Sequence, residues 1–152
     1  MKKKLFLLLL LSYGTVVFAQ ETPSTYDEKL AKSLNADEYG MKNYVFCLLK
    51  TGRNTTATKE ETQKLFEGHM ANINRLAKEG KLVVAGPFMK NERNYRGIYI
   101  FNAASIEEAK TFVATDPAVQ SNLLEAELTL WYGSAGLQET VKIHDKIAKN
   151  KI

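Results

Sequence analysis

The two histidines of this sequence, His69 and His144, are the side chains best suited to acid–base chemistry near neutral pH, because an unperturbed imidazole has a pKa of about 6.5. They form no H-x-x-x-H pair of the kind that binds zinc on a helix. His69 lies four residues after Leu65 and four residues before Ile73, so it shares the apolar face of a predicted helix. His69 is therefore the candidate site residue. The alternative is a histidine at the edge of the core that bonds a backbone carbonyl.

The helix that carries His69 belongs to a helix–strand unit that spans Leu65 to Phe88. Gly80 is placed to take the left-handed conformation that ends a helix. Leu82 to Ala85 then forms a compact apolar run, which predicts a buried strand. Gly86-Pro87 closes that strand, because proline has no N–H to donate to a sheet. We expect this helix–strand corner to border any cleft that contains His69.

The single cysteine, Cys47, excludes an internal disulfide and a zinc site built from cysteines. It lies within an apolar strand, where a buried hydrophobic role is favoured over a nucleophilic one. With no metal-ligand spacing among the histidines either, the sequence predicts neither a metal nor a cofactor.

The formal net charge of +4 comes mostly from three lysines among the first four residues, and the rest of the chain is close to neutral. There is no basic patch interleaved with aromatic residues, so nucleic acid is not an expected partner. At 152 residues the chain favours one domain with a sizeable core.

Residues 1–19 have the features of a secretory signal peptide: a lysine-rich start, an apolar stretch from Leu5 to Val17, and Ala19 before the predicted cut. The alternative is a membrane anchor. The apolar stretch is shorter than the roughly 20 residues that a spanning helix needs, and no cysteine follows Ala19 to carry a lipid. We expect the mature chain to begin at Gln20, to lie in the periplasm or outside the cell, and to have no membrane association after cleavage.

The remaining patterns predict an α+β fold with the order β-α-β-β-α-β. Two S/T-x-x-E capping boxes begin the two main helices, Thr58–Glu61 and Ser105–Glu108, and the second helix ends at Asp116-Pro117. The expected strands are Tyr44–Leu49, Leu82–Ala85, Gly97–Phe101 and Leu124–Tyr132, with a short helix within Tyr26–Leu34 and a weak one in the C-terminal tail. With right-handed crossovers this order gives the ferredoxin-like arrangement, in which a four-stranded antiparallel sheet has both helices on one face.

The first and third predicted strands are apolar on both faces, although helices cover only one face of such a sheet. A second copy of the chain is the simplest cover for the other face, since twofold dimers are the commonest oligomers. We therefore expect a homodimer. The predicted organisation is a signal peptide over 1–19, an extension over 20–42, the ferredoxin-like domain over 43–136 and a tail over 137–152.

Several short motifs, taken in their order, resemble the YCII-related domain family. They are Gly68-His69-Met70-Ala71-Asn72-Ile73, Glu79-Gly80-Lys81-Leu82, Ala85-Gly86-Pro87-Phe88 and Asp116-Pro117. The resemblance implies a dimeric α/β barrel of ferredoxin-like type and a site that pairs His69 with Asp116. It also implies small-molecule chemistry, because related members include a dehydrochlorinase of hydroxylated aromatics, and similar folds host muconolactone isomerases and small monooxygenases. The secretory signal departs from the pattern of those relatives.

Two functions follow from these observations. The first is a cofactor-free lyase or isomerase that uses His69 as acid and base on a small, cyclic or aromatic compound. The second is a non-catalytic dimer outside the cytoplasm that binds a small ligand in the same cleft. Asp116 has a structural alternative of its own, the capping of a turn that has Pro117 in its first position. Arg53, Arg93 and Arg96 lie in predicted loops, where they could hold an anionic ligand, although we favour their interpretation as solvated surface residues.

Overall fold

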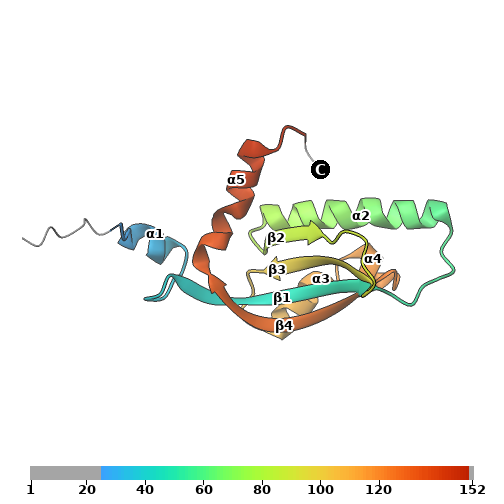
Figure 1. Ribbon diagram of the computed structural model, residues 1–152, viewed down its shortest axis with the longest axis horizontal. Helices are drawn as coiled ribbons and strands as arrows, with labels where there is room; N and C mark the ends of the chain where they lie inside the picture. Colours follow the sequence, from blue (N-terminus) through green and yellow to red (C-terminus); the bar gives the residue numbers. More distant parts are fainter. Residues whose placement is uncertain (1–24, 151–152) are drawn as a thin grey trace, which may run out of the picture.

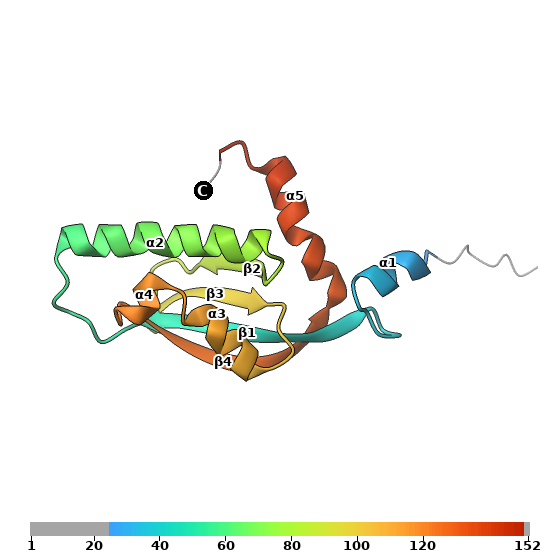
Figure 2. The same ribbon diagram turned by 180° about the vertical axis from the view of Figure 1, so that it is seen from behind.

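The computed structural model describes residues 25–150 and contains one four-stranded antiparallel sheet in the order β2-β3-β1-β4. The strands are β1 (Met41–Thr51), β2 (Leu82–Pro87), β3 (Tyr95–Phe101) and β4 (Leu124–Ser134). The main helices are α2 (Lys59–Lys78) and α3 (Ile106–Val113), and α3 is followed by the single turn α4 (Pro117–Gln120). All three cover the same face of the sheet (Figures 1 and 2). The predicted ferredoxin-like order and topology are confirmed.

Both main helices begin where the capping patterns predicted. The Thr58 hydroxyl accepts a hydrogen bond from the Glu61 amide, and the Glu61 carboxylate accepts one from the Thr58 amide. At α3 the Ser105 hydroxyl accepts from the Glu108 amide, but the Glu108 carboxylate bonds the amide of Ala104 instead of Ser105. These side chains satisfy N–H groups that have no partner within the helix.

The main core lies between the sheet and these helices. On β1, alternate residues Val45, Cys47 and Leu49 point toward the helices and are buried. They pack against buried residues of α2, β3, α3 and α4, including Leu76, Tyr99, Phe101, Phe112 and Ala118. The register places Cys47 opposite Tyr99 on one side and Leu128 on the other.

The opposite face of the sheet is only partly covered. At one end a smaller cluster joins Tyr44, Val83 and Ile100, with Leu137 packed against it. Leu137 belongs to η1 (Ala135–Glu139), a 3₁₀ helix that leads into α5 (Thr140–Ile147). Further along this face Phe46 and Leu48 remain partly exposed. The apolar second face predicted from the sequence is therefore present.

Segments on both sides of the ferredoxin-like domain lie near the same end of the sheet, where α1 (Glu28–Ser33) and α5 project (Figure 1). A backbone hydrogen bond joins the two segments, because the Ala135 amide donates to the Gly40 carbonyl. The side-chain amide of Gln138 donates to the Leu34 carbonyl at 2.7 Å. The predicted short N-terminal and C-terminal helices are confirmed.

The strands differ in length from the sequence prediction. β1 begins at Met41 and ends at Thr51 because its polar ends pair with β4 along the whole strand, and polar residues carry no apolar signal. β2 includes Pro87, which pairs with Gly97 at the edge of the sheet, where the missing N–H breaks no interior ladder. The predicted signal peptide, residues 1–19, lies outside the described residues. None of the helices within residues 25–150 is long and apolar enough to span a bilayer.

Candidate functional site

His69 and Asp116 lie side by side between α2 and the junction of α3 with α4. The distance between His69 Nδ1 and Asp116 Oδ2 is 2.8 Å, which is a short, buried hydrogen bond. His69 is 8% exposed and Asp116 is fully buried. The expected hydrogen bond between these two side chains is therefore present.

Asp116 also performs the structural role considered as its alternative. It is the N-cap of α4, with Pro117 in the first turn, and its Oδ1 accepts from the Ala118 amide at 3.0 Å. One carboxylate thus fixes a helix start with one oxygen and binds the imidazole with the other. The cap holds the carboxylate in a defined orientation, so His69 meets an acceptor that is already in position.

Tyr99 of β3 completes the cluster, and the sequence analysis did not identify it as a site residue. Its hydroxyl donates to Asp116 Oδ2 at 3.1 Å. It also lies 3.3 Å from Nδ1 and 3.4 Å from Nε2 of His69, with the two rings stacked at an interplanar angle of 29°. Because the hydroxyl is almost equally far from both nitrogens, it is directed at neither of them, and its directed hydrogen bond is the one to Asp116.

Burial raises the pKa of the Tyr99 phenol, and the nearby negative charge of Asp116 raises it further. The phenol therefore keeps its proton and acts as a permanent donor. Asp116 Oδ2 then faces two donors, Tyr99 O–H and His69 Nδ1–H, because a carboxylate only accepts hydrogen bonds. This network assigns the proton of the neutral imidazole to Nδ1 and the lone pair to Nε2. The lone pair that a general base would use is therefore on Nε2.

Gly68 permits the close approach of α2 and α4 that brings the pair together. A Cβ at this position would lie 3.0 Å from Cγ of Pro117, closer than ordinary van der Waals contact. Glycine in the middle of a helix costs roughly 0.5–1 kcal/mol relative to alanine. In return, the absence of a side chain at Gly68 lets Pro117, and with it Asp116, pack directly against the turn of α2 that carries His69.

A second polar cluster lies one turn further along α2. Asn72 Oδ1 accepts from Arg75 Nη2 at 2.7 Å and lies 2.9 Å from Thr115 Oγ1, the residue before Asp116. These contacts fix the orientation of the amide, since flipping it would point its NH₂ at the guanidinium. Asn72 is 7% exposed, and its Nδ2 has no hydrogen-bond partner among the described residues. Buried donors are rarely left without an acceptor, and the oxygen of a water or a ligand near His69 and Asp116 would supply one for Asn72 Nδ2.

Cys47 lies near Asp116 and Tyr99 but does not take part in acid–base chemistry. Burial raises the pKa of its thiol to about 12, with a smaller contribution from the charge of Asp116. The thiol is therefore protonated and packs as a small hydrophobe, as predicted. Among residues 25–150 no group of three His, Cys, Asp or Glu side chains is placed to hold a metal. His144 lies on α5, where its side chain is exposed.

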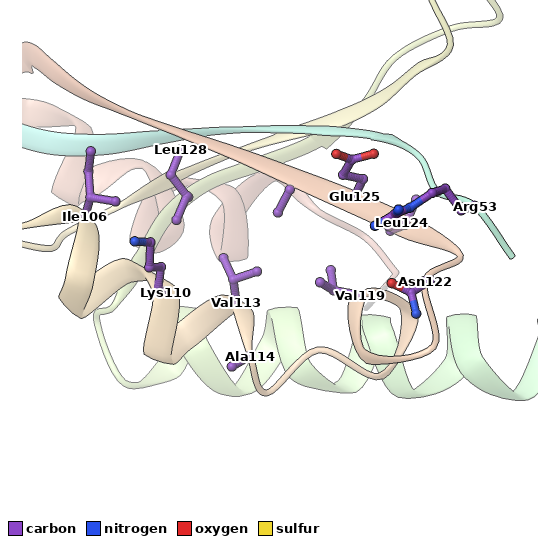
Figure 3. A pocket seen from close by; sticks show the side chains of 12 residues that line it. Arg53, Ile106, Lys110, Val113, Ala114, Val119, Asn122, Leu124, Glu125 and Leu128 are labelled. Atoms are coloured by element: carbon purple, nitrogen blue, oxygen red, sulfur yellow. The ribbon is translucent and has the colours of Figure 1, made fainter.

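The helix–strand corner Gly80–Phe88 does not line the pocket shown in Figure 3. That pocket is formed by α3, α4, β4 and the loop after β1, and neither His69 nor Asp116 is among its lining residues. Of the three arginines assigned to loops, Arg96 lies within β3, because that strand begins two residues before the predicted start.

The chain resembles a solved structure, the 5-chloro-2-hydroxyhydroquinone dehydrochlorinase TftG from Burkholderia phenoliruptrix AC1100 in complex with 2,5-dihydroxybenzoquinone. The two are 19% identical, with a TM-score of 0.41, and the match covers 57% of this chain and 90% of that one. A search of curated protein sequences gave no significant match. The model of the YCII-related domain matches residues 44–131, which include β1 from Tyr44, both main helices and His69, Tyr99 and Asp116. This match covers more than half of the sequence, and the chain therefore belongs to the YCII-related domain family.

Proposed function

We propose that this protein is a cofactor-free lyase or isomerase that acts on a small, cyclic or aromatic compound, with His69 as its acid–base residue. The observation that carries the proposal is the 2.8 Å bond between His69 Nδ1 and an Asp116 oxygen that also accepts from Tyr99. A histidine oriented by a carboxylate is a recurrent general base, because the carboxylate fixes the tautomer and stabilises the imidazolium.

The chemistry would begin when Nε2 removes a proton from a carbon next to a carbonyl group of the substrate. The positive charge that develops on the imidazole is stabilised by Asp116 through Nδ1–H. In an isomerase the same proton returns to a different carbon. In a lyase the electron pair of the broken C–H bond forms a double bond, and a leaving group departs with its own electron pair. The Asn72 amide is a nearby donor for a substrate oxygen.

The experiment that tests this proposal is a turnover screen with matched histidine variants. The purified protein is incubated with a panel of small hydroxylated and halogenated cyclic compounds, and products are followed by mass spectrometry. For any compound that is converted, His69→Ala should lower the turnover by about 10²-fold or more, the scale of a lost general base. His144→Ala should leave it unchanged, because that exposed side chain lies on α5. Equal turnover by the wild type and His69→Ala would refute the proposal.

Asp116→Asn should lower turnover less than His69→Ala, because the imidazole remains in place. An asparagine oxygen can still accept from the Ala118 amide, so the helix cap survives. The amide that replaces Oδ2 no longer accepts from Nδ1–H, and the ring loses its charged partner. A turnover equal to that of the wild type would show that Asp116 does not assist His69.

The near-complete burial of the pair leaves little of the imidazole open to a substrate, so a non-catalytic protein that binds a small ligand is a second candidate. His69 is only 8% exposed, and histidine and aspartate already satisfy one another. The same variants separate the two candidates. A catalyst loses turnover in His69→Ala while it keeps affinity for the converted compound, whereas a binding protein shows no turnover and loses affinity.

We also propose that the mature protein is exported and dimeric. Export is supported by the lysine-rich start and short apolar stretch of residues 1–19. Dimerisation is supported by the outer face of the sheet, where Phe46, Leu48 and Ile98 are only partly buried. A second copy packed on this face would remove their apolar surface from water.

A further inference from the structure

The pocket between α3, α4 and β4 has a volume of about 570 Å³, which is within the range of small-molecule sites. Its inner wall is apolar and consists of Val113, Val119, Leu124, Ala126 and Leu128. On β4 the residues Leu124, Ala126 and Leu128 share the face that points toward the helices, because side chains alternate along a strand. A ligand in this pocket would therefore place an apolar body against the sheet.

Two cations flank the apolar wall. Lys110 approaches from α3, and Arg53 approaches from the loop after β1 (Figure 3). Arg53 takes part in none of the ion pairs among residues 25–150. Lys110 has only a long contact with Glu107, at 3.9 Å between two exposed side chains, which is worth little in water.

The one carboxylate in the lining, Glu125, does not neutralise these cations from within the pocket. It follows Leu124 on β4, so its side chain points to the opposite face of the sheet, and it pairs in register with Lys50. Figure 3 shows its carboxylate directed away from Val113 and Lys110. The interior of the pocket is thus apolar, and its rim carries Arg53 and Lys110 together with Asn122 and the outward-facing Glu125.

The backbone that carries Arg53 is held firmly at the pocket. The Gly52 amide donates to the Leu123 carbonyl at 2.9 Å, and the Asn54 amide donates to the Asn122 carbonyl at 3.0 Å. A Cβ on Gly52 would lie only 2.1 Å from the Asn122 oxygen, so this close contact requires glycine. The two hydrogen bonds on either side of Arg53 fix where its side chain begins, which reduces the cost of ordering it on a ligand.

We infer that this pocket binds a small amphipathic anion, a compound with an apolar body along the wall and a carboxylate group that meets Arg53 at one end, while Lys110 lies at the other end (Figure 3). For Arg53 this selects the less favoured of the two sequence interpretations, an arginine that holds an anionic ligand. The inference goes beyond the proposed function, because the pocket shares no residue with His69, Asp116 or Tyr99.

The test compares octanoate with the uncharged octanamide in titrations of the purified protein, followed by ¹H–¹⁵N NMR. Octanoate should shift the amide signals of α3 and of the first half of β4, with an affinity roughly three- to fivefold above that of octanamide, the gain expected from one partly exposed charge contact. Equal affinities would overturn the inference, as would shifts confined to other surfaces. A dimer that covers the pocket, with no binding of either compound, would also overturn it.

Variants make the test specific. Arg53→Gln combined with Lys110→Gln should abolish the preference for octanoate, while the control pair Lys59→Gln and Lys78→Gln on α2 should keep it. Ala126→Leu should weaken the binding of both compounds, because the larger side chain fills part of the pocket beside the apolar wall. If the control pair loses the preference to the same extent, or if Ala126→Leu binds both compounds as the wild type does, the anion does not occupy this pocket.

Discussion

Replacement of Tyr99 by phenylalanine isolates the contribution of one hydrogen bond within the His69–Asp116 cluster. The change removes a 3.1 Å bond from a buried phenol to Asp116 Oδ2 and keeps the aromatic ring. Hydrogen bonds to charged groups contribute about 1.5–3 kcal/mol to stability. Asp116 retains its bonds to His69 and to the Ala118 amide, so we expect a loss of about 1.5–2 kcal/mol, near the lower end of that range.

Urea unfolding of the wild type and of Tyr99→Phe measures this loss, provided that the slope of the transition is unchanged. Tyr39→Phe is the control, because its side chain is 77% exposed, and it should change the free energy of unfolding by less than about 0.5 kcal/mol. A double-mutant cycle with Asp116→Asn tests whether the loss of stability in Tyr99→Phe comes from the hydrogen bond to Asp116. If Tyr99 acts through the carboxylate, Tyr99→Phe should cost at least about 1 kcal/mol less in the Asp116→Asn protein. Equal costs in both backgrounds would refute this reasoning.

Four further predictions concern other parts of the molecule. The thiol of Cys47 has its pKa raised from 9.0 to about 12 by burial, so its contribution to stability is present below pH 9 and is lost as the pH rises toward 12. Between pH 9 and 10 the free energy of unfolding should fall by about 1 kcal/mol more in the wild type than in Cys47→Ala, measured by urea unfolding. Gly68→Leu should cost about 1–3 kcal/mol in the same assay, because the larger side chain meets Pro117; a variant as stable as the wild type would exclude the tight contact. Light scattering should give twice the monomer mass, and Phe46→Glu on the outer sheet face should give the monomer, so a wild-type monomer would contradict the proposed dimer. Intact-mass measurement of exported protein should show a chain that begins at Gln20, and retention of residues 1–19 would exclude cleavage.

The secondary structure was predictable because strong local signals mark it. The capping boxes at Thr58 and Ser105 and the glycine at position 80 set the helix ends, and the apolar runs set the strand cores. The strand ends were not predictable in the same way, since polar residues such as Lys42 and Asn43 pair with β4 without any apolar pattern. α4 was missed because a helix of four residues is about one turn long, too short for a repeating pattern.

The site was only partly predictable from residue types and spacing. The helical period places His69 on the inner face of α2, but it does not specify which side chain the imidazole meets. Asp116 was matched to His69 by resemblance to a family, not by spacing. Tyr99 looked like an ordinary strand residue, because alternation assigns a residue to a face of the sheet and does not identify what lies above it.

The contact between His69 and Asp116 depends on the packing of Gly68 and Pro117, which no pattern in the sequence predicts. Gly68 removes the side chain that would separate α2 from Pro117. Pro117 starts α4, and the cap of that helix orients the carboxylate of Asp116 toward the imidazole. Because one carboxylate caps α4 and also bonds His69 and Tyr99, the stability of this corner and the orientation of the imidazole depend on the same side chain. The structural and functional interpretations of Asp116 are therefore not alternatives, since the helix cap is the means by which the fold positions the acid–base pair.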